Sequence, residues 1–495
     1  MIVRRFGLAK EVDGDIKTPL LLKCEKDVRY DHNGENFIFL DYPIKKEILY
    51  PPSIKQSEVE IKDKVYLIPN INTMIRDSHR FVEYTINIRE KYGYEAIFYA
   101  PGVPENLIPI LIYMGYDIFD DCLSKIKCTS LWGSRENCER DAEYIFSLTV
   151  RALKDGRLRE FIEGIPNNKT QEILRILDFK YYDILEQFYP IYMDSLNAVT
   201  VQSIYRPDII RWRERILNRY NKPKYAKYLL LLPCSARKPY SESRSHKLMR
   251  RYIKSTMHEV ILTSPLGLVP RELERFYPAM NYDIPVVGIW YEEEKKMIKE
   301  ILGKYLNKFE YDKIISFLPE NMNFLEGLLQ EYDAEMIWGK NLDALAEKTS
   351  SLNYKVSRSK VLIDNIKSLS TFQFDIDFDF SYAKLRGRAP RLDIIINNKR
   401  FFGFDIHRGM LTLTLSSAKK LVEEGKYVVE IDDFHPEGDV FAAGIVNASP
   451  EIRISDEVAV AYQGELRAWG TARMSSYDMR VLSHGKAVKI RGRSQ

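Results

Sequence analysis

Hydrophobic and polar positions along the first 195 residues follow the order expected for strands that alternate with helices. Apolar runs at 65–71 and 96–101 predict strands, and 80–95 has apolar side chains at helical spacing. A helix and then a strand are predicted over 104–119. This order favours βα units.

The next pattern, over 196–344, is also of the α/β kind. It predicts a helix at 206–220, strands at 228–233, 259–265 and 285–291, and then a helix rich in Glu and Lys. Between 345 and 419, alternation at 372–384 and 391–406 predicts strands, and 416–424 predicts a helix.

The pattern changes again over 420–495, where short apolar strands are separated by Gly, Asp and Asn turns, as in a small β-barrel. We therefore predict a multidomain fold, α/β followed by β. The expected parts are an α/β domain at 1–195, a second at 196–344, a small α+β domain at 345–419 and a barrel at 420–495.

Composition narrows the class of protein. Hydrophobic residues make up 45% and charged residues 29%, which is ordinary for a globular chain. The net charge is only +4, so any nucleic-acid site must be a local patch. The N-terminus carries charges where a signal peptide is apolar, and no apolar run approaches the roughly 20 residues of a membrane span. We expect a soluble cytoplasmic protein with no membrane partner.

The five cysteines are scattered and form no CxxC pair, and no Cys/His set has the spacing of a structural zinc site. This usage suits free thiols in a reducing compartment. We predict no metal and no cofactor. The cysteines are Cys24, Cys122, Cys128, Cys138 and Cys234.

Reactive side chains concentrate in the stretch 229–246, LLLLPCSARKPYSESRSH. Leu229–Leu232 predicts a buried strand, and a helix is expected to begin near Ser243, capped by Ser241 or Ser243. Ligands of open α/β sheets bind at the carboxyl ends of strands, beside helix N-termini. The candidate catalytic residues are Cys234, Lys238 and His246, and the candidate substrate-binding residues are Ser235, Arg237, Tyr240, Ser243, Ser245 and Ser264.

Simpler interpretations of these residues remain open. A cysteine that follows a buried strand is usually a small core residue. Arg237 and Lys238 are also suited to binding phosphate alone, and His246 to capping or packing in the first turn of a helix.

The last segment resembles a PUA domain, a small RNA-binding barrel. The resemblance rests on 454–460, 468–472 and 484–490, with Ser455 in place of the usual glycine. An unrelated small barrel is the alternative. A cluster of cations supports an RNA phosphate surface. Its members are Arg467, Arg473, Arg480, Lys486, Lys489, Arg491 and Arg493.

The first segment resembles part of a tRNA-guanine transglycosylase at 100–107 and 114–120. In that family the position of Asp120 holds the nucleophile. The stretch with the second catalytic aspartate and the cysteine-rich zinc site are absent from this sequence, and 195 residues are fewer than the roughly 250 of a complete (β/α)8 barrel. We expect a degenerate barrel that retains shape or tRNA contact and does not exchange bases.

The motif 233–246, together with 263–273 and 282–286, resembles archaeosine synthase, a transglycosylase-related family with a terminal PUA domain. The resemblance implies an enzyme that acts on archaeal tRNA carrying 7-cyano-7-deazaguanine at position 15. It adds an amine, most simply that of free lysine, to the nitrile and forms an amidine precursor of archaeosine. Glutamine is the alternative donor, and a radical-SAM partner protein and a homodimer are compatible with this scheme.

The resemblance also suggests roles for the motif. Cys234 is expected to form a thioimide, with its pKa lowered by the helix N-terminus and by Arg237 or Lys238. Lys238 is expected to orient a phosphate or the donor's carboxylate, His246 to move protons, and Tyr240 to stack on the base. A competing hypothesis is a non-catalytic subunit that presents tRNA to a partner enzyme.

Overall fold

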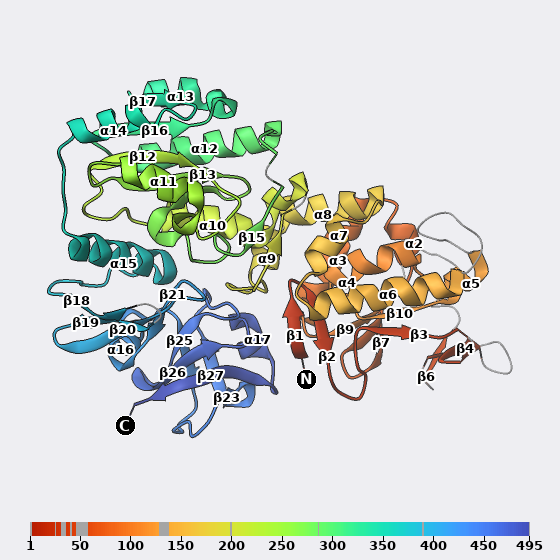
Figure 1. The fold of residues 1–495 in the computed structure, drawn as a ribbon. Helices are drawn as coiled ribbons and strands as arrows, with labels where there is room; N and C mark the ends of the chain where they lie inside the picture. The colour runs from red at the N-terminus through yellow and green to blue at the C-terminus, as the bar shows by residue number, and fades with distance from the viewer. Residues whose placement is uncertain are drawn as a thin grey trace. The chain divides into compact units, whose positions relative to one another are not determined.

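The computed structural model describes residues 2–24, 26–30, 36–39, 42–45, 58–127, 138–198, 200–285, 287–388 and 391–494 of the 495-residue chain. Cys128 and Val286, which belong to the sequence predictions above, lie outside these ranges. The chain divides into two compact units (Figure 1). The first comprises 1–189, 441–443 and 477–486, and the second comprises 190–440, 444–476 and 487–495.

The first unit is built around a five-stranded sheet in the order β3-β10-β9-β8-β7. Four of these strands are parallel, and only β7 runs antiparallel to its neighbour. The βα units predicted from the sequence are therefore confirmed. The strands are β3 (Leu20–Leu22), β7 (Val59–Lys62), β8 (Val65–Leu67), β9 (Ile97–Tyr99) and β10 (Ile118–Asp120).

Helices connect strands of this sheet, one hairpin (β1 and β2) precedes it in sequence, and a three-stranded antiparallel sheet (β4, β5 and β6) lies between β3 and β7 in sequence. The helices are α2 (Ile71–Met74), α3 (Ser78–Tyr92), α4 (Ile108–Tyr113), α5 (Cys122–Lys127), α6 (Cys138–Lys154), α7 (Leu158–Glu163), α8 (Asn168–Lys180) and α9 (Tyr182–Glu186). The hairpin strands are β1 (Ile2–Phe6), β2 (Ala9–Val12), β4 (Val28–Tyr30), β5 (Asn36–Phe39) and β6 (Tyr42–Lys45). A buried cluster that includes Leu22, Leu67, Tyr99 and Ile118 forms its core.

The second unit opens with an α/β domain whose sheet has the order β14-β13-β12-β16-β17. The strands β12 (Tyr228–Pro233), β13 (His258–Thr263), β16 (Lys313–Leu318) and β17 (Glu335–Trp338) are parallel, and β14 (Gly267–Pro270) is antiparallel. A separate short pair joins β11 (Leu196–Asn197) to β15 (Tyr282–Asp283). The helices are α10 (Pro207–Asn218), α11 (Arg244–Tyr252), α12 (Glu292–Lys308), α13 (Glu326–Glu331) and α14 (Leu342–Ser351).

The helix α15 (Arg358–Phe374) leads into an antiparallel meander of β18 (Lys384–Arg388), β19 (Arg391–Ile396), β20 (Lys399–Asp405) and β21 (Met410–Leu413). The predicted strand at 372–384 is wrong, because 372–374 end the helix, 375–380 have no strand partner in the described structure and 381–382 form a turn. Phe378 and Phe380 nevertheless alternate with exposed aspartates, and they bury their rings as the pattern indicated.

The predicted strand at 285–291 is also wrong in its described residues. They form a loop in which Val287 and Ile289 are about 70% exposed and Gly288 has a φ of 73°. An apolar run alone does not distinguish a buried strand from an exposed loop, because it records residue types and not which elements cover them.

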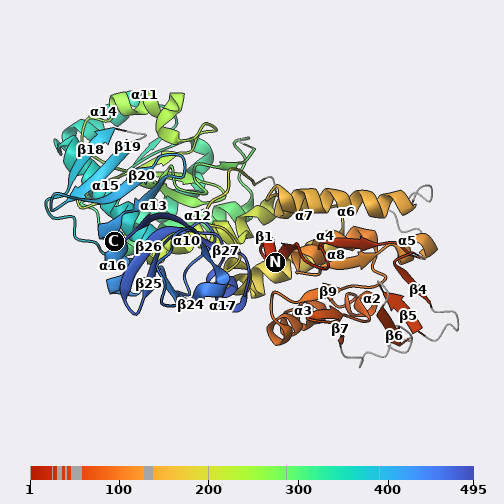
Figure 2. The same cartoon turned by 90° about the horizontal axis from the view of Figure 1, so that it is seen from below.

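The last domain is a six-stranded sheet in the order β23-β27-β26-β25-β22-β24. Helix α16 (Leu415–Glu424) packs against β20 of the meander and against β25 and β26 of this sheet (Figures 1 and 2). The strands are β22 (Val428–Ile431), β23 (Val440–Phe441), β24 (Ile445–Ala448), β25 (Glu457–Tyr462), β26 (Glu465–Ala472) and β27 (Lys486–Arg493), with α17 (Ser476–Val481) before the last. None of the helices in the described part of the chain combines the length and apolar character that a membrane span needs.

Candidate functional site

The candidate site lies where the parallel strands β12 and β13 end. The two strands pair in register from Leu229 with His258 to Pro233 with Leu262, so Cys234 and Thr263 follow at the same edge of the sheet. The predicted strand is confirmed, and its four leucines are buried. Helix α11 begins after the loop, with the Ser243 hydroxyl accepting a hydrogen bond from the His246 N–H at 3.2 Å.

Three hydroxyl groups and one thiol are linked at this edge. The hydroxyl of Tyr282 lies 2.6 Å from that of Tyr240 and 2.6 Å from Thr263 Oγ1. Thr263 also forms a hydrogen bond with the Cys234 side chain. Residues at or beside β12, β13 and β15 thus share one chain of hydrogen bonds.

The ammonium group of Lys238 lies over this cluster, with Nζ 3.8 Å from the centre of the Tyr282 ring. Burial lowers the pKa of Lys238 below its ordinary value, and the charge of Asp283 offsets this only in part. A lysine in such a setting loses its proton more readily than a surface lysine, which is the property of lysines that act as bases or nucleophiles.

The Cys234 thiol does not behave as the sequence suggested. We expected a lowered pKa, but burial raises the pKa of Cys234, although the hydrogen bond from Thr263 and the charge of Lys238 act in the opposite direction. The resting form is therefore the thiol, and a thiolate requires a base beside it.

His246 is held by both of its ring nitrogens. Nε2 lies 3.0 Å from the Pro233 carbonyl oxygen, and Arg271 donates to Nδ1 at 2.8 Å. Burial, followed by the charge of Arg271, lowers the pKa of His246 to about 4. The ring is thus neutral at neutral pH and ties the end of β12 to Arg271, an arrangement that favours a positioning role.

The other predicted residues differ in what they offer. Tyr240 is fully buried, so neither face of its ring is open to a base in this conformation. The Ser235 hydroxyl donates to the Arg237 carbonyl at 3.0 Å and closes the loop, while Arg237 itself is exposed. Ser245 is exposed, with its hydroxyl 3.3 Å from that of Ser243. Ser264 Oγ is buried without a hydrogen-bond partner among the described residues.

Sequence reasoning missed Thr263, Tyr282 and Asp283 as members of the site. Thr263 and Tyr282 begin the stretches 263–273 and 282–286, which carry part of the family resemblance. A signal was therefore present, but nothing in the spacing told us that β15 lies beside the ends of β12 and β13.

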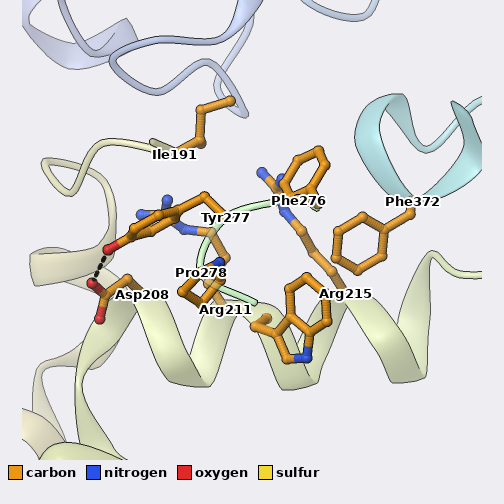
Figure 3. A pocket seen from close by; sticks show the side chains of 9 residues that line it. Ile191, Asp208, Arg211, Arg215, Phe276, Tyr277, Pro278 and Phe372 are labelled. Carbon is orange, nitrogen blue, oxygen red and sulfur yellow. Dashed lines mark hydrogen bonds between the residues drawn. The ribbon is translucent and has the colours of Figure 1, made fainter. Parts of the chain in front are cut away.

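A separate small pocket lies along α10 in the second unit (Figure 3). Trp212, Phe276, Tyr277 and Phe372 supply aromatic walls, and Tyr277 donates a hydrogen bond to Asp208 at 2.6 Å. Arg215, which also lines it, is buried, and its Nε has no hydrogen-bond partner in the described part of the chain.

The cations predicted to bind RNA fall into two groups. Arg473, Arg480, Lys486 and Lys489 are exposed. Arg467 is 12% exposed in its side chain and pairs with Glu465 at 3.1 Å. The Arg491 side chain is 39% exposed but pairs with the fully buried Glu457, with Nη1 2.9 Å from Oε1. The last two therefore bind carboxylates of their own domain.

Asp120, in the first unit, is buried at the end of β10. Its Oδ2 accepts hydrogen bonds from the Tyr99 hydroxyl and the Gly102 N–H, both at 2.8 Å, and burial raises its pKa. These hydrogen bonds hold the Asp120 carboxylate in place.

Comparison with protein families identifies the parts of the chain. A PUA domain model matches residues 429–493, and a model described as a domain of unknown function matches 209–355, which contains Cys234, Lys238 and Thr263. The predicted PUA domain is confirmed, and the chain is a multidomain α/β protein with a C-terminal PUA domain built on a six-stranded sheet.

Relatives that match along most of the chain are more specific. The chain is 35% identical to the archaeosine synthase subunit alpha of Thermoplasma acidophilum, over 98% of this chain and 99% of that protein. It is 32% identical to the archaeosine synthase subunit alpha of Thermococcus kodakarensis, over 87% and 81%. A tRNA-guanine(15) transglycosylase of Methanocaldococcus jannaschii is 25% identical over 69% of this chain and 50% of that protein. The chain belongs to the archaeosine synthase family, which is related to the tRNA-guanine transglycosylases.

Proposed function

We propose that this protein takes part in archaeosine formation in tRNA by adding an amine to the nitrile of 7-cyano-7-deazaguanine at position 15, with free lysine as the donor. The observation that carries the proposal is Lys238, a half-buried lysine with a lowered pKa, beside the Cys234 thiol at the carboxyl edge of a parallel sheet. The names of the relatives support archaeosine formation, and the PUA domain supports tRNA as the substrate.

The reaction needs proton transfer and no redox step. The donor nitrogen forms a bond to the nitrile carbon, one π bond of the nitrile opens, and one proton moves from the donor nitrogen to the nitrile nitrogen, which gives an amidine. Free lysine carries its amine mainly as an ammonium at neutral pH, so a base must first remove a proton. Holding both reactants in one orientation lowers the barrier further.

Lys238 is the base in this scheme. A neutral Lys238 amine accepts the proton of the donor ammonium, and the resulting Lys238 ammonium is stabilised by the nearby charge of Asp283 and by the face of Tyr282. The linked hydroxyls of Thr263, Tyr282 and Tyr240 are suited to passing a proton toward the nitrile nitrogen.

The protonated Cys234 thiol leaves two routes. In the covalent route Lys238 takes the thiol proton, sulfur bonds to the nitrile carbon and the nitrile nitrogen gains a proton, which gives a thioimide; the amine then displaces the thiol. In the direct route the amine attacks the nitrile, and Cys234 only packs or donates a proton.

Substitution of Cys234 separates the routes. The covalent route requires that Cys234→Ser abolish turnover and that a protein–tRNA adduct accumulate in the unsubstituted protein when the donor is omitted. Near-normal turnover of Cys234→Ser would leave the direct route. Mass spectrometry of the intact protein after nuclease digestion detects the adduct.

The surrounding residues are proposed to bind and position the substrates. Arg237 is exposed and suits a phosphate. The Ser264 hydroxyl, which has no hydrogen-bond partner in the described part of the chain, suits a polar group of the base or donor. Ser235, Ser243 and Ser245 shape the loop between β12 and α11. His246 positions the end of β12 through its hydrogen bond with Pro233.

The first unit is proposed to be a degenerate remnant of a transglycosylase barrel that contributes shape or tRNA contact. The relationship to tRNA-guanine transglycosylases and the parallel strands β3, β8, β9 and β10 support this. The name "subunit alpha" of two relatives supports a second protein that acts with this one.

The direct test is to incubate the protein with tRNA that carries 7-cyano-7-deazaguanine and isotopically labelled lysine or glutamine. Mass spectrometry of the digested nucleosides is expected to show a lysine adduct of the modified base, and tRNA with guanine at position 15 serves as the control. Transfer of the amide nitrogen of glutamine to the modified base would show that glutamine, and not lysine, is the donor. Binding without any product, with Lys238 intact, would instead support the non-catalytic tRNA-binding subunit.

A further inference from the structure

Two cysteines that are far apart in sequence meet in the first unit at the ends of strands β3 and β10. These strands are parallel, and Leu22 pairs with Asp120. Cys24 follows β3, and Asp121 and Cys122 follow β10, so all three lie at one edge of the sheet. One ligand atom from each of these three residues lies within 4.8 Å of the other two.

The local backbone holds these groups in place. The Cys24 N–H donates to Asp121 Oδ1 at 2.7 Å, and the Asp121 N–H donates to the Leu22 carbonyl at 3.2 Å. The Cys122 N–H donates to Asp120 Oδ1 at 3.0 Å. Asp121 is buried, whereas both cysteines keep some exposure, so an ion has access to a site that is built on strand ends.

We propose that Cys24, Asp121 and Cys122 bind a zinc ion. Two cysteine sulfurs and one carboxylate oxygen are ligands that Zn2+ accepts in tetrahedral sites, and water completes such a set when the protein provides three ligands. Binding requires both thiols to lose their protons, which the ion itself promotes. Soft sulfur ligands disfavour Mg2+ and Ca2+, which prefer oxygen.

The charges around the three residues are consistent with a cation. Asp121 is itself one of the three residues, and Asp120 lies beside them, with its Oδ1 accepting a hydrogen bond from the Cys122 N–H. Lys23 competes for this position, with Nζ 3.7 Å from Asp121 Oδ2, but its ammonium also pairs with Glu143. Lys23 can therefore stay paired with Glu143 while Asp121 turns to the ion.

This site was invisible to the spacing rules that we applied to the sequence. Zinc motifs place pairs of ligands a few residues apart, whereas Cys24 and Asp121 are 97 positions apart. The inference is independent of the proposed function, because it concerns the first unit and not the loop that carries Lys238.

Elemental analysis of the full-length protein, purified under reducing conditions without chelator, tests the proposal. We expect about one zinc ion per chain. Cys24→Ser and Cys122→Ser are each expected to reduce the zinc content to background, while Cys234→Ser, in the other unit, retains it. Undiminished zinc in both of the first two variants, or no zinc in the unsubstituted protein, would overturn the proposal.

Two further measurements keep the test valid if the variants fold poorly. Replacement of zinc by Co2+ is expected to give the sulfur-to-metal charge-transfer absorption of a thiolate site. Alkylation followed by peptide mapping is expected to show less modification of Cys24 and Cys122 in the zinc-bound protein than in the chelator-treated protein. A disulfide between Cys24 and Cys122 in place of zinc, in protein kept reduced, would contradict the proposal.

Discussion

Lys238 illustrates how burial and a single aromatic neighbour change the chemistry of one residue. Its ammonium lies against the Tyr282 ring, where water is partly excluded, and desolvation disfavours the charged form. The charge of Asp283 restores part of the lost stabilisation of the ammonium. The balance leaves a lysine whose neutral form is accessible nearer to neutral pH than that of a surface lysine.

Replacement of Lys238 tests its role as a base. We expect Lys238→Met to lose about a hundredfold or more in turnover, the scale of a positioned proton-transfer group. Lys238→Arg is expected to fail as well, because a guanidinium keeps its proton. The affinity of both variants for tRNA should change little. In the unsubstituted protein, turnover should fall as pH decreases, with an apparent pKa below that of an ordinary lysine. Steady-state kinetics and filter binding measure both quantities.

Lys247, exposed on α11, provides the matched control, since Lys247→Met removes the same group from the same helix-and-loop region. Retained turnover in Lys238→Arg would mean that Lys238 acts only through its charge.

His246 makes a prediction about stability rather than activity. Its pKa is about 4 in the folded protein and 6.5 in the unfolded chain, so the unfolded state binds the proton first as pH falls. The free energy of unfolding should therefore decrease from pH 6.5 to pH 4, by about 3 kcal/mol in total from this residue. His246→Gln should flatten that part of the profile in urea unfolding.

The matched control is His79→Gln, which makes the same substitution at an exposed histidine on α3. An unchanged slope in His246→Gln would show that the ring is not held neutral in the folded state.

At the scale of elements, α10 carries arginines with opposite energetic roles. Arg206, just before the helix, makes two hydrogen bonds of 3.2 Å to Asp208, and both residues are buried. Arg215, two turns along the helix, is buried without a partner for its Nε, and burial together with the charge of Arg219 lowers its pKa to about 10. Arg206 also leaves its Nη1 without a hydrogen-bond partner among the described residues, so the two arginines differ in the carboxylate of Asp208, which only Arg206 contacts in the described structure.

The two arginines should therefore respond differently to the same substitution. Arg206→Met leaves Asp208 buried without its ion pair and should cost about 3 to 5 kcal/mol of unfolding free energy. Arg215→Met removes a poorly compensated charge and should be neutral or stabilising by about 1 kcal/mol or more. Chemical denaturation of the two variants decides the matter. A loss of several kcal/mol in Arg215→Met would contradict the assignment.

Elements that buried their apolar face were predicted well, and those without a partner strand were not. The strand at 228–233 and the helix at 206–220 match β12 and α10 closely. The stretch 375–383 alternates as a strand does, because its phenylalanines pack inward, yet the described structure pairs it with no neighbour. Alternation reports which side chains are buried, and hydrogen-bond pairing is a separate property.

At the scale of the whole molecule, the PUA domain is where the sequence and the structure assign cations differently. Glu457 is fully buried and accepts from the Leu413 N–H at 3.0 Å, so Arg491 compensates a charge at the boundary with the meander. Lys489 and Arg473 are exposed, and in the described structure neither compensates a buried carboxylate. We therefore expect Arg473 and Lys489 to contact RNA phosphates and Arg491 to hold Glu457.

Salt dependence of tRNA binding separates these cations. Arg473→Gln and Lys489→Gln should each weaken binding and reduce the slope of log K against log salt concentration by about one. Arg491→Gln should leave that slope unchanged and instead lower the free energy of unfolding by about 2 kcal/mol, since Glu457 loses a charged hydrogen bond. A reduced slope in Arg491→Gln would place its guanidinium at the RNA.

The amino-acid sequence was enough to predict the α/β character of the first two segments, the C-terminal PUA domain and the loop that carries the candidate site residues. These properties are local, because periodicity, turn residues and dense motifs are written in neighbouring positions. Even the departure at Ser455 falls on a turn, with a φ of 77° that glycine would adopt more easily. Tertiary structure alone decided that Tyr282 and Thr263 join Cys234, that burial raises the pKa of this thiol, and that Cys24 meets Cys122. Those properties depend on which strands lie side by side and on how far water is excluded, and neither is encoded at a fixed distance along the chain.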